Sequence, residues 1–323
     1  MRAIEITDHG TGGVLEVATK SQPAPGEHEV RIDVEAIGVN FADIDHRRGR
    51  YPDTPAVPYV PGMEAAGTIT ETGPGVERTV GDRVVALLET GAYAETIVAP
   101  THRLFEIPDS VALHTAAGFP VQFLTAHYAL HERGNITSDD RVLIHAAAGG
   151  VGSAAVQLAA TTEAEVFGTA STTEKLALAC DLGLDNPINY EDHDIVDEID
   201  QLTNETGVDL VLDGVGGEAF YKSLDALAGF GRVVSYGVAS GDIPAAATPR
   251  LLFENKSVLG FHLGHTFKHH PERVATVARQ LLEQIAADDL EVVIDRTFPL
   301  ADAATAHEYV ENRESVGKVL LEP

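Results

Sequence analysis

The segment from Arg141 to Ala159 restricts the fold of this chain more than any other stretch of its sequence. It opens with a short aliphatic run, Arg141–His145, which is typical of a strand buried on both faces of a sheet. A tight turn of Ala and Gly follows, and then a run of small helix-forming residues. A strand, a small-residue turn and a helix in this order predict an α/β fold with a doubly wound parallel sheet.

The turn matches the dinucleotide-binding fingerprint G-x-G-x-x-G, with Ala at the first position. Ala147, Gly149 and Gly152 are its three small residues, and Gly150 and Val151 lie between them. The small residues allow a tight turn, a close approach of the backbone to a pyrophosphate, and close contact between helix and strand. Free N–H groups and the positive end of the helix dipole would then bind the phosphates. The alternative is a glycine-rich loop without a ligand.

The spacing of strands and helices predicts two domains. Up to about residue 120, short strands are broken by Pro and Gly, which indicates a compact, mostly β domain. Two of the expected strands are Glu29–Val39 and Ala92–Ala99. An Ala-rich helix is expected over Ala116–Arg133, and a strand of the second domain over Val208–Asp213. After about residue 120, strands alternate with helices until about residue 262, as in a doubly wound sheet. The remaining helices and strands are expected to pack back on the first domain. We therefore predict one domain at 1–122, completed by 263–323, and a nucleotide-binding domain at 123–262.

The chain is strongly acidic. It has 323 residues, with 50 Asp and Glu against 22 Lys and Arg, and a formal net charge of −28. This charge disfavours nucleic acids and anionic membranes as partners, and concentrated salt would screen its self-repulsion, so we hypothesise a halophilic source. No apolar run is long enough for a membrane span. The single cysteine, Cys180, gives no disulfide framework; we expect a cytoplasmic protein with Cys180 in its core.

The order of a Pro- and Gly-rich β domain, an A-x-G-x-x-G unit and a C-terminal return resembles the medium-chain dehydrogenase/reductase superfamily. Four segments resemble its zinc-free, ζ-crystallin-like quinone oxidoreductase branch. They are Gly38–Asn40 with Asp43 and Arg47, Gly81–Arg83, Ala146–Gly152 with Gln157, and Ala306–His307. This resemblance covers the whole chain. It implies a GroES-like catalytic domain, a Rossmann domain that binds NADPH, and a homodimer.

The positions that would hold zinc can be compared by residue type. Zinc-dependent members of the superfamily carry a Cys before the first helix, a His in a Gly-His-Glu turn, and a Cys or Asp in the linking helix. Here these positions read Asn40, Met63 and Val121. Zinc needs thiolate, imidazole or carboxylate ligands, so we predict a zinc-free protein. Without a Lewis acid, quinones and activated double bonds are the hydride acceptors that positioning alone can serve.

The choice of nicotinamide cofactor depends on the strand after the fingerprint helix. NAD enzymes place an acid about 20 residues beyond the fingerprint. Here Gly168–Lys175 has hydroxyls and a Lys but no acid at the strand tip, which favours NADPH, although Glu174 beside the Lys argues against it. The resemblance implies that the 2′-phosphate is held by Ser171 or its neighbours, Lys175, Tyr190 and Arg313.

The resemblance also implies a set of residues around the nicotinamide. Asn40 would face it from the first domain, or else serve as a helix N-cap. Asp43 is a second catalytic candidate, or a first-turn acid that complements the helix dipole. Tyr51 could stack on an aromatic substrate or supply a proton, or else pack beneath a proline-rich loop. Further cofactor contacts are expected from Gln122, Thr125, Thr169, Gly237 and Ser240.

These features together predict an NADPH-dependent quinone oxidoreductase. An enoyl-thioester or enone (2-alkenal) reductase of the same superfamily is one alternative, and a non-catalytic NADPH-binding protein is another. For the homodimer, Ser257–Phe261 is the expected edge strand, because an exposed apolar edge otherwise invites aggregation. The histidines at 262, 265, 269 and 270 are interpreted as solvated rather than as a metal site, because their spacing fits no closed tetrahedral site.

Overall fold

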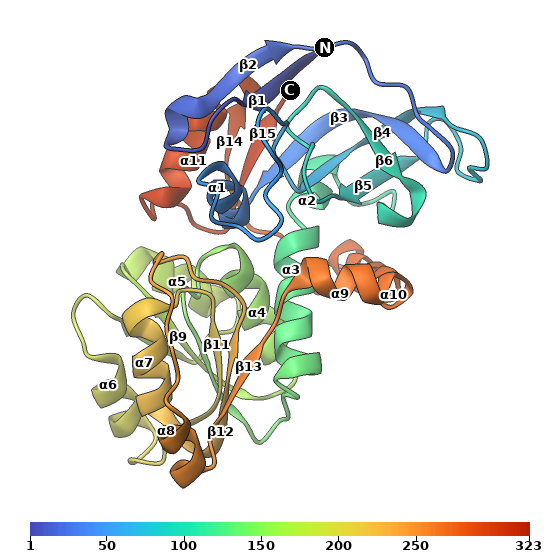
Figure 1. The fold of residues 1–323 in the computed structure, drawn as a ribbon. Coiled ribbons are helices and arrows are strands. Elements are labelled where there is room, and N and C mark those ends of the chain that lie inside the picture. Colours follow the sequence, from blue (N-terminus) through green and yellow to red (C-terminus); the bar gives the residue numbers. More distant parts are fainter. The chain divides into compact units, whose positions relative to one another are not determined.

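The computed structural model describes all residues from 1 to 323, and the chain divides into two compact units. The first unit contains Met1–Val121 and Gly264–Pro323, so the C-terminal segment belongs with the N-terminal part of the chain (blue and red in Figure 1). The second unit is Gln122–Leu263 (green to orange). This second unit begins one residue before and ends one residue after the range predicted from the sequence, 123–262.

The first unit is built on a sheet of seven strands, with the order β14-β15-β3-β4-β5-β7 and with β6 also pairing with β3. Its longest strand, β3 (Glu29–Val39), alternates between buried and more exposed residues over its first half and is wholly buried over its last four residues. That end is therefore covered on both faces. The other strands of the sheet are β4 (Glu64–Thr72), β5 (Arg83–Leu87), β6 (Thr96–Pro100), β7 (Leu104–Glu106), β14 (Ile294–Pro299) and β15 (Lys318–Glu322).

Helices and a small second sheet complete the first unit. Helix α1 (Phe41–Arg47) follows β3 directly and contacts α11 (Ala303–Glu311), which also packs on β15. Strands β1 (Arg2–Ile6) and β2 (Leu15–Thr19) form an antiparallel pair. The remaining helices are α2 (Leu113–Ala117), which packs on β3 and β4, and α10 (Pro271–Ala286), which contacts β7; α9 (Leu263–His269) begins at the boundary of the units.

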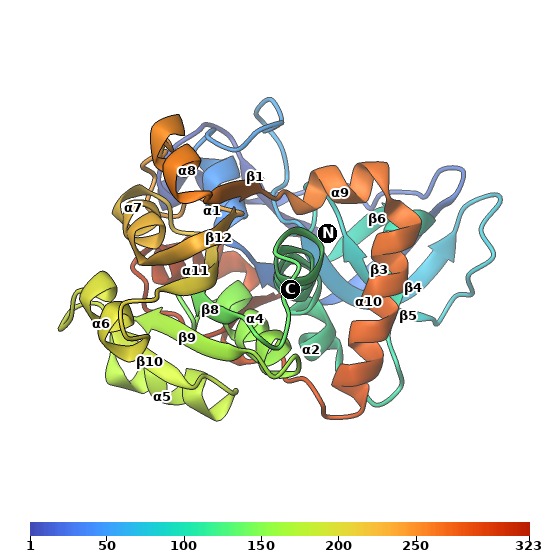
Figure 2. The ribbon, with the colours of Figure 1, turned by 90° about the horizontal axis from the view of Figure 1, so that it is seen from below.

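The second unit is a six-stranded parallel sheet of order β10-β9-β8-β11-β12-β13, seen from another side in Figure 2. From β8 the chain first proceeds outward through β9 and β10, and then returns to β11 and continues the other way. The switch point between β8 and β11 is where open α/β sheets bind ligands. The strands are β8 (Arg141–Ile144), β9 (Glu165–Ala170), β10 (Asn186–Asn189), β11 (Val208–Asp213), β12 (Leu227–Ser235) and β13 (Ser257–Gly260).

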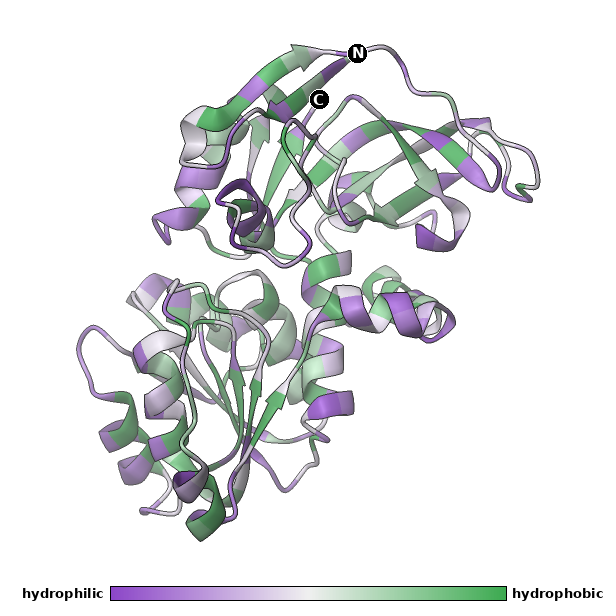
Figure 3. Cartoon of the chain, in the orientation of Figure 1, coloured by the Kyte–Doolittle hydropathy of each residue, from purple (hydrophilic) through white to green (hydrophobic).

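Hydropathy follows this architecture. The strands of the parallel sheet are largely apolar, whereas the helices alternate between apolar and polar faces (Figure 3). The helices are α3 (Pro120–His127), α4 (Gly150–Ala160), α5 (Thr173–Asp181), α6 (Ile195–Leu202), α7 (Gly217–Ala226) and α8 (Thr248–Glu254). No helix in the structure has both the length and the apolar character needed to cross a membrane.

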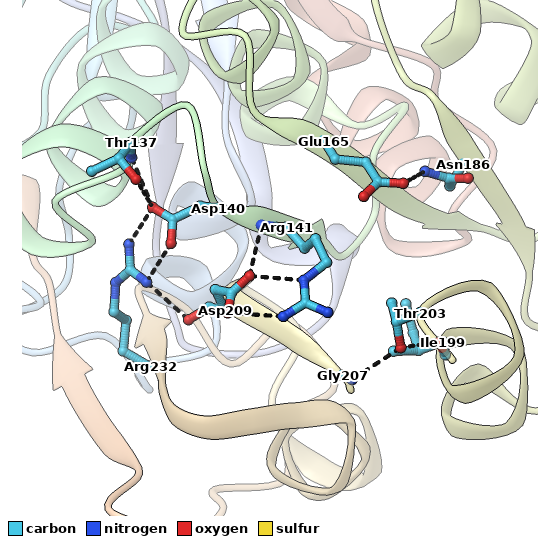
Figure 4. A network of polar contacts seen from close by, with 10 residues as sticks. All are labelled: Thr137, Asp140, Arg141, Glu165, Asn186, Ile199, Thr203, Gly207, Asp209 and Arg232. Carbon is cyan, nitrogen blue, oxygen red and sulfur yellow. Dashed lines mark hydrogen bonds and ion pairs between the residues drawn. The ribbon is translucent and has the colours of Figure 1, made fainter. Parts of the chain in front are cut away.

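Two ion pairs link the strands near their amino ends (Figure 4). Arg232 of β12 donates to both carboxylate oxygens of Asp140, at 2.9 and 2.8 Å. Arg141 of β8 donates through Nε and Nη2 to Asp209 of β11, at 2.9 and 3.1 Å. Bidentate pairs of this kind fix geometry well. They hold together the amino ends of the strands, at the end of the sheet opposite to the fingerprint turn.

Three expectations about local structure were wrong. Ala92–Ala99 is not one strand: only Thr96–Pro100 forms β6, because the backbone of Ala92 and Tyr93 bonds to Gly62 and Pro61 instead. The helix expected over 116–133 is broken into α2, α3 and a π-helical turn, Tyr128–Arg133. Cys180 is exposed rather than in the core, because the buried face of α5 is formed by Leu176 and Ala179.

Candidate cofactor and substrate sites

The fingerprint turn lies at the carboxyl end of β8, in the second unit. Gly149 occupies the N-cap position of α4, without a side-chain cap and without an acid in the first turn. A Cβ atom at Gly152 would lie 2.0 Å from the carbonyl oxygen of Ala146, so only Gly fits there. The first N–H groups of a helix have no acceptor within the helix. The turn at Ala147–Gly152 therefore leaves donors available for an anion at the positive end of the helix.

Gln122 supplies a second sign of a ligand-binding site. It lies on α3 and is only 2% exposed, yet neither its Oε1 nor its Nε2 atom has a hydrogen-bond partner in the protein. A buried carboxamide without partners is rare in native proteins. Thr125 is also buried, and as the residue three positions further along it lies near Gln122 on the helix surface. The pair fits a ligand that offers both a hydrogen-bond donor and an acceptor.

Thr169 is engaged inside the protein. Its hydroxyl lies 3.1 Å from Nδ1 of the buried His145, whose Nε2 lies 2.8 Å from Oγ of Ser223. The Ser223 hydroxyl donates to the carbonyl of Ala219, so it accepts from Nε2–H, and the Thr169 hydroxyl then donates to Nδ1. Burial lowers the pKa of His145, in keeping with a neutral ring. The side chain of Thr169 therefore holds His145 in one tautomer.

Two turns meet at the carboxyl ends of β11 and β12. Asp213 is fully buried, and its Oδ1 accepts from the N–H groups of Val215 and Gly216, at 2.8 and 3.0 Å. Its Oδ2 has no partner. Gly237 packs so closely on this turn that a Cβ atom would lie 2.9 Å from the carbonyl oxygen of Gly214. The exposed Ser240 accepts from the N–H of Asp242 at 3.2 Å.

Three of the four residues expected around a 2′-phosphate lie in the second unit. Ser171 follows β9, and Thr172 caps α5 by accepting from the N–H of Lys175 at 3.3 Å. The N–H of Tyr190 donates to the carbonyl of Ala170, which places Tyr190 beside the end of β9. Arg313 belongs to the first unit, where it is exposed and has a φ of 60° after α11.

In the first unit, Asn40 lies where β3 meets α1. It is the N-cap residue of α1, in a capping box with Asp43. Its Nδ2 donates to Oε1 of Glu64 at 2.9 Å, and its Oδ1 accepts from Nζ of Lys318 at 2.7 Å. Lys318 also forms an ion pair with Glu64, which is fully buried. Neither partner of Asn40 was predicted from the sequence.

Asp43 lies at the end of a chain of buried hydrogen bonds. Nη1 of Arg47 lies 3.3 Å from Nδ1 of His307, whose Nε2 lies 2.9 Å from the Tyr93 hydroxyl. Because Arg only donates, Nδ1 accepts and Nε2–H donates to Tyr93. The Tyr93 hydroxyl in turn donates to Oδ2 of Asp43 at 3.4 Å. Burial and the neighbouring Arg47 lower the pKa of His307 to about 3, so the ring is neutral.

The carboxyl group of Asp43 is an unusual acid. Its Oδ2 also accepts from the N–H of Asn40 at 2.9 Å, whereas Oδ1 is buried without a partner. Burial raises its pKa to about 7, against the opposing effects of the Asn40 N–H and Lys318. The group can therefore exchange a proton near neutral pH, which suits a general acid.

Tyr51 packs on α1 close to Asp43. Its ring lies 4.3 Å from the ring of His46, at an angle of 35°. His46 and Asp43 are three residues apart, so they share one face of α1. The pKa of Tyr51 is raised to about 12, mainly by burial and in second place by the charge of Asp43. The structure thus gathers Asn40, Asp43 and Tyr51 around the short helix α1.

No group of three or more His, Cys, Asp or Glu side chains in the chain has the arrangement of a metal site. Of the four histidines between 262 and 270, His265 and His269 are in ring contact, with centroids 4.4 Å apart.

Comparisons with known proteins agree with this architecture. Residues 26–109 match the family model described as alcohol dehydrogenase GroES-like domain, and residues 150–283 match the one described as zinc-binding dehydrogenase. The chain is 37% identical to a 2-haloacrylate reductase of a Burkholderia species, covering 98% of this chain and 97% of that one. It is 37% identical to the human synaptic vesicle membrane protein VAT-1 homolog, covering 100% and 86%.

A solved structure has the same fold over its full length. The quinone oxidoreductase of Escherichia coli, crystallised in complex with NADPH, superimposes with a TM-score of 0.95 at 33% identity, over the full length of both chains. The chain belongs to the medium-chain dehydrogenase/reductase superfamily, in its quinone oxidoreductase branch. The fold expected from the sequence, a GroES-like domain with a parallel-sheet Rossmann domain, is thereby confirmed.

Proposed function

We propose that this member of the superfamily is an NADPH-dependent oxidoreductase that transfers a hydride to a quinone. The observation that carries the proposal is the uncapped glycine turn at the switch point of the second unit, followed by a strand without an acid at its carboxyl end. The E. coli relative of the same fold is a quinone oxidoreductase in complex with NADPH.

The residues of the second unit fit this cofactor. When bound, NADPH supplies the hydride. The backbone of Ala147–Gly152 holds the pyrophosphate, and Ser171, Lys175 and Tyr190 bind the 2′-phosphate. The buried carboxamide of Gln122, with Thr125, binds the nicotinamide amide, because an amide offers one donor and one acceptor to another amide. The turns at Gly237 and Ser240 pack against the same end of the sheet.

The residues of the first unit serve the acceptor. A quinone binds beside Asn40 and Tyr51, and the reduced oxygen receives its proton from Tyr51 or from solvent. Asp43 can restore that proton near neutral pH, because burial brings its pKa to about 7. We propose that the reaction uses no zinc, because Asn40, Met63 and Val121 stand at the positions of the metal ligands. We place it in the cytoplasm, where the exposed Cys180 stays reduced.

The test is oxidation of NADPH in molar salt against a panel of quinones, with NADH in parallel. We expect quinone turnover with NADPH preferred, and a Lys175→Met variant that loses this preference while it keeps turnover with NADH. Binding of NADPH without turnover of any acceptor would instead favour the non-catalytic alternative.

An activated alkene is the second candidate substrate. It is favoured by the 37% identity with a 2-haloacrylate reductase over nearly the whole of both chains. A conjugated alkene requires the same hydride delivery as a quinone. Turnover of enones, 2-haloacrylates or enoyl thioesters, with no turnover of quinones, would select this candidate.

We also propose that the chain forms a homodimer through the edge strand β13. Phe230 on β12 and Phe253 on α8, next to this edge, are 79% and 80% exposed, and Leu252 is 65% exposed. Exposed aromatic side chains beside an unpaired strand edge are typical of an interface. Light scattering at high salt tests this proposal. A monomeric mass would contradict it, and Phe253→Asp is expected to shift the mass from dimer to monomer.

A further inference from the structure

Three polar side chains meet where β15, β3 and β4 lie side by side in the first unit. Val319 of β15 is opposite Val39 of β3, and Gly38 of β3 is opposite Glu64 of β4. This register brings Lys318, Asn40 and Glu64 together although they are far apart in the sequence. They are 3%, 8% and 0% exposed. We call this group the Asn40 triad.

The triad fixes the orientation of the Asn40 amide. A Lys ammonium only donates and a carboxylate only accepts, so the atom facing Nζ of Lys318 must be the amide oxygen. The atom facing Glu64 must then be the amide nitrogen. Flipping the amide would turn both bonds into clashes of like groups. One Nδ2 hydrogen is used by Glu64, and the second has no acceptor within the protein.

The remaining amide hydrogen is held rigidly and polarised. Glu64 is itself held, since its Oε2 accepts from the N–H of Val121 at 2.8 Å. Gly38 leaves room for the carboxylate, because a Cβ atom there would lie 2.3 Å from Oε1. An ammonium at the amide oxygen draws electron density from the nitrogen and so strengthens its N–H groups as donors.

We propose that Lys318 is a positioning residue that acts through Asn40, whose free Nδ2–H donates to the carbonyl oxygen of the hydride acceptor. The inference rests on the proposed function and adds a specific role for this chain's own residues. When the two electrons and the proton of the hydride add to a quinone or enone, the cofactor is oxidised and negative charge develops on that oxygen. A fixed donor stabilises this charge until a proton arrives from Tyr51 or solvent. The expected substrates therefore carry a conjugated carbonyl oxygen.

The test is a double-mutant cycle that keeps the buried charge balanced. The variants are Asn40→Ala, the pair Glu64→Gln with Lys318→Met, and the combination of all three. The matched control is Glu5→Gln with Lys20→Met, which removes another Lys–Glu ion pair of the same unit, between β1 and the end of β2. The measurements are kcat and KM for 9,10-phenanthrenequinone, the Kd for NADPH by calorimetry, and the melting temperature.

We expect Asn40→Ala to lower kcat roughly 100-fold, as for loss of one donor to a developing oxyanion. The Glu64–Lys318 pair variant should lower kcat roughly tenfold with KM changed far less. The combination should be no slower than Asn40→Ala, because Lys318 acts through Asn40. The Kd for NADPH of each variant should equal that of the wild type. The control variant should have the kcat and KM of the wild type. If the pair variant does not fold, Lys318→Arg, with and without Asn40→Ala, completes the cycle.

The outcomes separate this inference from the proposed function. The role of Lys318 would be overturned if the losses in kcat of Asn40→Ala and of the pair variant multiplied in the combination, or if the pair variant had the kcat of the wild type. Either result would leave the proposed quinone reductase activity unaffected. A wild-type chain that binds NADPH but reduces neither quinones nor enones would overturn both. Loss of NADPH affinity in step with kcat would show a merely structural role.

Discussion

Replacing Asp43 by Asn should make the free energy of unfolding depend less steeply on pH. In the native state burial raises the pKa of Asp43 from 3.8 to about 7. The folded chain therefore binds this proton more tightly than the unfolded chain does. Between these two values the folded state holds more protons, so stability falls as pH rises and levels off above the folded pKa. The amide of Asn cannot ionise and removes this dependence.

The magnitude follows from the size of the shift. One pKa unit corresponds to about 1.4 kcal/mol, so the buried charge costs about 4 kcal/mol when Asp43 is fully ionised. Between pH 5 and pH 8, the wild type should lose roughly 2–3 kcal/mol relative to Asp43→Asn. No discount for solvent screening applies, because the side chain is wholly buried. The Asn oxygen can still accept from the N–H of Asn40.

The assay is urea unfolding of both chains across this pH range in molar salt. The same substitution at an exposed position, Asp109→Asn, is the control. The reasoning is refuted if the difference between wild type and Asp43→Asn is the same at pH 5 and pH 8, since Asp43 would then keep one protonation state throughout.

Three further predictions concern other parts of the chain. Gly38→Ala should lower stability by about 1–3 kcal/mol in thermal unfolding, because its Cβ would lie 2.3 Å from Glu64 Oε1 and 2.6 Å from the carbonyl of Ala117; an unchanged melting temperature would contradict the packing. Gly152→Val should abolish NADPH binding in calorimetry, because its side chain meets the Ala146 carbonyl, while the first unit stays folded. Salt should raise the melting temperature steeply between about 0.1 and 3 M, where the Debye length falls from about 10 Å to below 3 Å; full stability in dilute neutral buffer would contradict a halophilic source.

Much of the fold follows from local patterns in the sequence. The strands Glu29–Val39 and Val208–Asp213 have the predicted bounds, because buried apolar runs are bounded there by turn residues. The helix around 116–133 was predicted as one piece because its apolar residues are continuous. Its interruption before Pro120 reflects the missing backbone donor of proline, which sequence periodicity does not record.

The site was predictable only in part. The fingerprint turn is local, so its residues could be named from spacing. Glu64 and Lys318 were missed because their roles depend on strand register. Glu64 lies 24 positions from Asn40 in the sequence, and Lys318 lies 254 positions from Glu64. The available signal was a buried charged residue at the first position of each of two strands, β4 and β15. His307 was noted in the sequence, but its contact with Arg47 depends on how α11 packs on α1.

The backbone and the side chain of Asn40 have different partners. Its backbone occupies the N-cap position, and the carboxylate of Asp43 accepts from its N–H. Its side chain bonds to Glu64 and Lys318. An apolar set of the same volume would stabilise such an interior at least as well as a buried ion pair does. Near the start of α1 the chain buries the ammonium of Lys318, the carboxylate of Glu64 and the Asp43 carboxyl group, whose pKa is about 7. Proton and charge handling at this site therefore explains these groups better than stability does.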